Sequence, residues 1–98
     1  MGNEELAQTI LAGFVEDLPR RIEALREMLQ RGNAKDATMQ AHTIKGATAT
    51  VGGEAVRALA AALEESGRKG DLQGMRSRLA EIEAGAAELL LAIGRGLG

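Results

Sequence analysis

The chain has 98 residues, with 12 Lys and Arg against 14 Asp and Glu, one His, one Phe and no Cys, Trp or Tyr. The absence of Cys excludes disulfide frameworks, Cys-ligated metals and thiol nucleophiles, and a single His excludes multi-His metal sites. The slightly acidic balance and near-absence of aromatic side chains argue against nucleic-acid binding. The longest apolar run, Leu89–Ile93, is too short to cross a bilayer, and the N-terminus lacks the basic start of a signal peptide. We therefore expect one cytoplasmic domain.

Apolar residues recur at helical spacing through the first 31 residues and predict two helices, at about 4–15 and 18–31. Pro19 lies between the two patterns. It is compatible with either the first turn of a second helix or a kink in one long helix. We favour a short N-terminal helix followed by a longer one.

The middle of the chain predicts helices at about 34–51 and 54–67. Asn33 is a candidate N-cap, and Gly52 and Gly53 separate the two apolar stripes. Asp71 then caps a last helix at about 71–93, whose apolar positions alternate in steps of three and four, and residues 94–98 are expected to fray.

Amphipathic helices joined by short turns predict an all-α fold, an antiparallel up-down four-helix bundle with a short extra N-terminal helix. The same alternation of three and four could build an intermolecular coiled coil. Because the turns are short, we favour folding back within one chain and expect a monomer.

Residues 41–53 are poorly explained by folding alone. Gly46 lies inside a predicted helix, where glycine costs roughly 1 kcal/mol relative to alanine. At about 100° per residue, His42 lies on the side of this helix away from the apolar stripe and faces solvent. Lys45 and Gly46 follow it by one turn, and no carboxylate lies one turn away in either direction. Gly46 is interpreted as clearance beside the imidazole, with tight helix crossing as the alternative.

This arrangement suits phosphoryl transfer through His42. A neutral imidazole nitrogen is a competent nucleophile near pH 7, and Lys45 would offset the charge of an attached phosphoryl group. An open helix face admits a protein partner rather than a small substrate.

The segment from Ala41 to Gly53 resembles the signature of histidine-containing phosphotransfer (HPt) domains, His-x-(Leu/Ile)-Lys-Gly with a further Gly about six residues on. The residues that fit this pattern are His42, Ile44, Lys45, Gly46 and Gly52. The likeness extends from about Phe14 to Ile93. It implies a phosphocarrier in which His42 accepts a phosphoryl group from a receiver-domain aspartate, or from a linked kinase, and passes it to a response regulator.

The resemblance also implies roles for other residues. A Glu or Gln at the position of Glu64 accepts a hydrogen bond from the imidazole in this family, which would hold the proton on Nδ1 and leave Nε2 free. The surface around His42 would dock the partner, and the candidates for that surface are Phe14, Met39, Ala49 and Arg68. Phe14 could equally belong to the core, and Arg68 could be an ordinary solvated side chain.

The partners implied are receiver domains and a histidine kinase, with no nucleic acid and no membrane. We expect no enzyme activity, no ATP site, and no metal or cofactor on this domain, because the receiver would carry the Mg²⁺. The resemblance fits both a stand-alone carrier and a part of a larger hybrid kinase.

Two alternatives stay open. One is the phosphoacceptor domain of a chemotaxis-type histidine kinase, which carries a very similar motif around its histidine. The other is a helical adaptor or dimerisation module, in which His42 is incidental.

Overall fold

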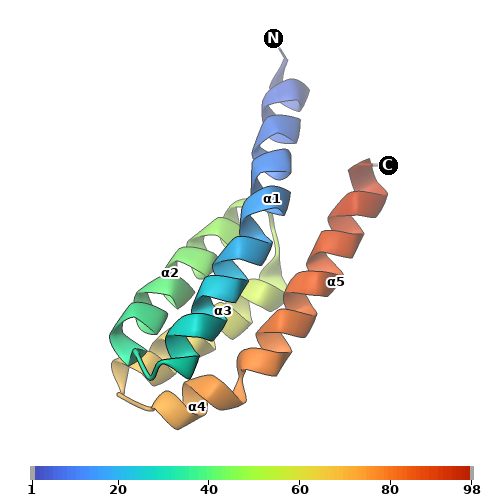
Figure 1. The fold of residues 1–98 in the computed structure, drawn as a ribbon. Coiled ribbons are helices and arrows are strands. Elements are labelled where there is room, and N and C mark those ends of the chain that lie inside the picture. Colours follow the sequence, from blue (N-terminus) through green and yellow to red (C-terminus); the bar gives the residue numbers. More distant parts are fainter. Residues whose placement is uncertain (1, 98) are drawn as a thin grey trace.

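Five helices contain most of residues 2–97, the part of the chain that the computed structural model describes. They are α1 (Asn3–Gln30), α2 (Ala34–Thr50), α3 (Glu54–Arg68), α4 (Leu72–Ser77) and α5 (Leu79–Leu97). The four longer helices run lengthwise, and α4 lies at the end of the bundle opposite the two termini (Figure 1). The all-α helical bundle expected from the sequence is confirmed. No helix in the described range is long and apolar enough to cross a membrane.

The turns after α1, α2 and α3 share one geometry. Each contains a glycine with φ between 72° and 75°, and the residue after that glycine donates its N–H to a carbonyl five residues earlier, at 2.8–2.9 Å. This is the Schellman arrangement, in which a left-handed glycine ends the helix. The three glycines are Gly32, Gly52 and Gly70. The turns after α1 and α2 reverse the chain, so α1, α2 and α3 pack as antiparallel neighbours, and the turn after α3 leads into α4 at the end of the bundle (Figure 1).

The core is aliphatic and is built from the predicted stripes. Helix α1 buries Leu18, Leu25 and Leu29 to 1% exposure or less. Helices α2 and α3 make the most extensive contact in the bundle, and alanines at 0% exposure lie on both of them. Small side chains allow close approach of two helices, and this close pair is the one that carries the candidate site.

The expected break near Pro19 is absent, and α1 is a single helix with Pro19 in its interior. Proline cannot donate the hydrogen bond to the carbonyl of Val15, four residues earlier. Pro19 is exposed, so water can reach that carbonyl. The prediction of a separate short N-terminal helix was therefore wrong. Leu6 and Ile10, which were assigned to it, lie in the first turns of α1 and are 56% and 47% exposed.

The helix expected at 71–93 is divided at Arg78 into α4 and α5. In a continuous helix the Arg78 N–H would bond to the Gly74 carbonyl. The hydroxyl of Ser77 takes that carbonyl at 2.8 Å instead, and the Arg78 N–H bonds to Met75 at 3.2 Å. Helix α5 then continues to Leu97, beyond the expected end at 93, so the tail predicted to fray is largely helical. Gly98 lies outside the described residues.

Candidate functional site

His42 lies on the outer side of α2, as predicted, with 65% of its side chain exposed. Its neighbours Ala41 and Ile44 point into the core at 0% exposure, so the periodicity of α2 fixes the direction of the imidazole. The helix begins at the predicted cap, where the Asn33 side chain accepts from the N–H of Asp36 at 3.2 Å.

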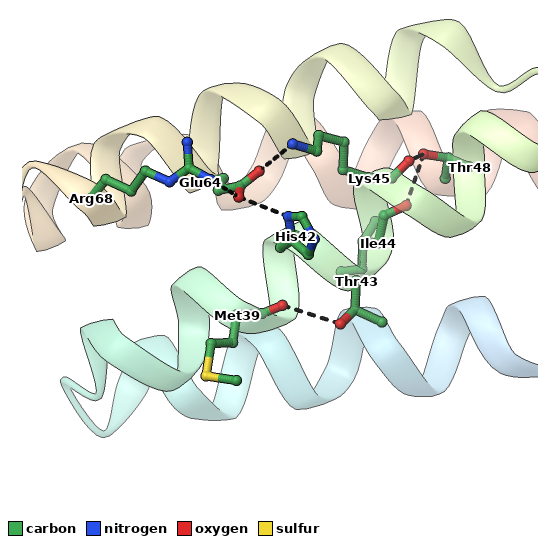
Figure 2. Close-up of polar contacts among 8 residues, drawn as sticks. All are labelled: Met39, His42, Thr43, Ile44, Lys45, Thr48, Glu64 and Arg68. Carbon is green, nitrogen blue, oxygen red and sulfur yellow. Dashed lines mark hydrogen bonds and ion pairs between the residues drawn. The ribbon is translucent and has the colours of Figure 1, made fainter.

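Glu64 lies on α3 opposite His42 and is only 4% exposed. Its Oε2 atom is 2.8 Å from Nδ1 of His42 (Figure 2). The structure thus brings together the two residues that the resemblance paired, across the close packing of α2 against α3.

Two cations complete the shell around the Glu64 carboxylate. Lys45 places Nζ 2.6 Å from Oε1, and Arg68 places a guanidinium nitrogen 2.6 Å from Oε2 (Figure 2). Lys45 lies one turn of α2 from His42, as predicted, and in this structure its amine is bound to Glu64. Two cations and one carboxylate leave the site with a net positive charge beside the imidazole.

These contacts keep Glu64 ionised. The hydrogen bond from Lys45 lowers the pKa of the Glu64 carboxyl; burial opposes this, but the His42 hydrogen bond and the charges of Arg68 and Lys45 add to the lowering. An ionised carboxylate can only accept, so the proton of the shared bond must lie on Nδ1 of His42. In the neutral imidazole, Nε2 then carries the free lone pair.

The threonines around His42 satisfy their hydroxyl groups within α2. Thr43, Thr48 and Thr50 donate their hydroxyls to backbone carbonyls four residues earlier, at 3.2, 2.8 and 3.1 Å. At Gly46 an added Cβ would meet no atom within 4 Å. The alternative that Gly46 permits tight helix crossing is therefore wrong, and its role as clearance for a partner stays a prediction.

The candidate docking residues occupy different environments. Met39 is 63% exposed and lines a shallow hollow together with His42, Glu64 and Arg68. Ala49 is exposed farther along α2. Phe14 is 9% exposed and belongs to the core, the second of the two possibilities left open by the sequence, so it offers little surface to a partner.

The contact of Arg68 with Glu64 was missed from the sequence, although a signal for it existed. The two residues are four positions apart on one helix, a spacing at which a glutamate and an arginine commonly pair. The contact of Lys45 with Glu64 joins two helices, and no spacing rule predicts it. Within residues 2–97, no three His, Asp or Glu side chains cluster as a metal site would require.

Comparison with known proteins identifies the family. Residues 9–92 match the family model described as the Hpt domain, which covers most of the chain. The searches of curated proteins and of solved structures found no match.

Proposed function

The chain belongs to the Hpt domain family, whose members are histidine phosphotransfer intermediates of phosphorelays, and we propose that His42 is its phosphoryl acceptor and donor. The observation that supports this most strongly is the pairing of an exposed imidazole with a buried carboxylate. Glu64 orients Nδ1, while 65% of the His42 side chain is open to solvent.

In the proposed reaction, the lone pair on Nε2 of His42 attacks the phosphorus of an aspartyl phosphate on a receiver domain. The new N–P bond forms as the P–O bond to the aspartate breaks, and the aspartate leaves as a carboxylate. The proton on Nδ1 stays in place, so the ring gains positive charge as the bond forms. The Glu64 carboxylate, 2.8 Å away, stabilises that charge. Transfer to the next receiver is the reverse reaction on a different aspartate.

Lys45 is the group proposed to stabilise the phosphoryl group once it is attached. It follows His42 by one turn of α2, and its side chain is 30% exposed. Its amine can exchange the Glu64 oxygen for a phosphoryl oxygen by rotating about its side-chain bonds. Such an exchange would place a positive charge where two negative charges arrive.

The division of labour between carrier and partner follows from the exposure of the site. Phosphoryl transfer depends mainly on positioning and charge stabilisation. This chain supplies the oriented nucleophile, and the receiver supplies the aspartate and its Mg²⁺. We propose that a monomer, in the cytoplasm, carries out the exchange.

The direction of transfer is tested by pulse and chase. The protein is incubated either with phosphorylated receivers or with a histidine-kinase catalytic domain and ATP, and an unphosphorylated receiver is then added. A phosphorelay carrier takes label from a receiver and loses it to a second receiver. Labelling by the kinase domain alone would support the chemotaxis-type phosphoacceptor, and no labelling from either donor would leave a helical adaptor.

A further inference from the structure

Arg68 and His42 share one oxygen atom of Glu64. Oε2 lies 2.6 Å from the Arg68 guanidinium and 2.8 Å from Nδ1 of His42, whereas Oε1 bonds to Lys45 at 2.6 Å. The position of the oxygen that orients the imidazole is therefore set on one side by Arg68, and the second oxygen is held by Lys45.

The two cations are not equivalent when a phosphoryl group arrives. Lys45 is on the same helix as His42 and is the cation proposed to turn toward the phosphoryl group. Arg68 is on α3, four positions from Glu64, so its contact does not depend on the packing of α2. Once Lys45 leaves, Arg68 is the permanently charged side chain that stays on a carboxylate that is 4% exposed, beside the ring of His42. A buried carboxylate without a cation tends to take up a proton, and it would then be a poorer acceptor for Nδ1.

We propose that Arg68 is a positioning residue, which holds Oε2 of Glu64 against Nδ1 of His42 and allows Lys45 to change partners. The inference rests on the proposed role of His42 as phosphoryl acceptor. It departs from the expectation that Arg68 docks the partner protein, because Arg68 acts through Glu64 and is needed even without a protein partner.

The test uses phosphoramidate, a small phosphoryl donor that needs no docking surface. Nε2 attacks its phosphorus, the P–N bond breaks and ammonia leaves. The rate of phosphohistidine formation is followed by intact mass in the wild type, Arg68→Gln, Glu64→Gln and the double variant. Arg68→Lys tests rescue. Arg57→Gln is the matched control, because Arg57 pairs with Glu54 on the same helix and contacts no residue of the site.

We expect Arg68→Gln to slow phosphorylation several-fold, Arg68→Lys to restore most of the rate, and Arg57→Gln to leave it unchanged. In the Glu64→Gln background, Arg68→Gln should have no further effect. The proposal is overturned if Arg68→Gln reacts like the wild type, or if it slows the Glu64→Gln protein by the same factor. The second result would mean that Arg68 acts on the donor directly.

A second readout needs no phosphorylation. Nitrogen-15 NMR of the His42 ring reports which nitrogen carries the proton. Arg68→Gln should lower the fraction of the Nδ1–H tautomer, and an unchanged fraction would overturn the proposal. If the wild-type protein accepts no phosphoryl group from any donor, the proposed function fails, while this measurement still decides the role of Arg68.

Discussion

Nδ1 of His42 lies 2.8 Å from Oε2 of Glu64, although the two residues are 22 positions apart in the sequence and on different helices. The contact joins an exposed side chain to a buried one, because 65% of the His42 side chain and 5% of the Glu64 side chain are exposed. The nucleophile is thus presented at the surface, while the group that orients it is held in the packed interface of α2 and α3.

Acid should remove the contribution of Glu64 to stability. Because folding lowers the pKa of this carboxyl, its contribution is fully present above the ordinary value of about 4.5 and is lost as the pH falls through the lower folded value. Glu64→Gln has no such proton to bind. The difference in unfolding free energy between wild type and Glu64→Gln should therefore shrink below pH 4.5, as measured by urea denaturation. A difference that stays constant down to about pH 2.5 would contradict the ionised, cation-bound carboxylate.

Lys45→Ala should slow phosphorylation of His42 several-fold and shorten the lifetime of the phosphorylated protein, because no cation would then turn toward the phosphoryl group. The lifetime is measured by loss of the added mass at neutral pH. Lys69→Ala is the matched control, since Lys69 is exposed and pairs with Glu65, which is not part of the site. Equal lifetimes for the two variants would remove Lys45 from the site.

Gly46→Ala should raise stability while lowering transfer from protein donors. A Cβ at this position meets nothing within 4 Å, so the substitution should stabilise α2 by about 0.5–1 kcal/mol. If the empty space admits a receiver, transfer from a phosphorylated receiver slows, while the rate with phosphoramidate stays the same. Unaltered transfer from the receiver would show that the clearance is not used.

The sequence predicted the bundle well because burial of apolar stripes determines it. Leu18, Leu25, Ile44, Leu63 and Ile82 are buried as these stripes predict, although Leu89 and Ile93 at the end of the last stripe are only partly buried. The division at Arg78 could not be read from the same pattern, because Met75 and Ile82 stay on the core side across the break. It depends on the Ser77 hydroxyl taking one carbonyl, a local competition that periodicity does not report.

The residues of the site also fall into two groups, those that the sequence predicted and those whose contacts could be seen only in the structure. The exposure of His42 followed from helical geometry, and the role of Glu64 was available only through resemblance to a family. The contact of Lys45 with Glu64 depends on the distance between α2 and α3, whereas the contact of Arg68 is made within α3 and depends on side-chain conformation. The sequence therefore predicted neither the contact of Lys45 nor that of Arg68 with Glu64.

Pro19→Ala should stabilise the protein by about 1–3 kcal/mol, because it restores a helical N–H to an interior position of α1 and removes the ring clash. The loss of proline's restriction on the unfolded chain offsets part of the gain. Gly13 lies on the same helix, and a Cβ added there would meet nothing within 4 Å. Gly13→Ala is therefore the reference variant for an ordinary gain in helix propensity, which is up to about 1 kcal/mol. A Pro19→Ala protein no more stable than the wild type would indicate that α1 does not need a continuous hydrogen-bond ladder there.

Measurement of intact mass tests most directly whether His42 carries the phosphoryl group. Wild type and His42→Gln are incubated with a phosphorylated receiver, and their intact masses are measured at neutral pH and again after brief acid treatment. The exposed side chain predicts that His42→Gln keeps its helicity and loses no more stability than one hydrogen bond contributes, about 0.5–1.5 kcal/mol. We expect one phosphoryl mass on the wild type, labile to acid and absent from the variant. Equal labelling of His42→Gln, or a label that survives acid, would contradict the assignment.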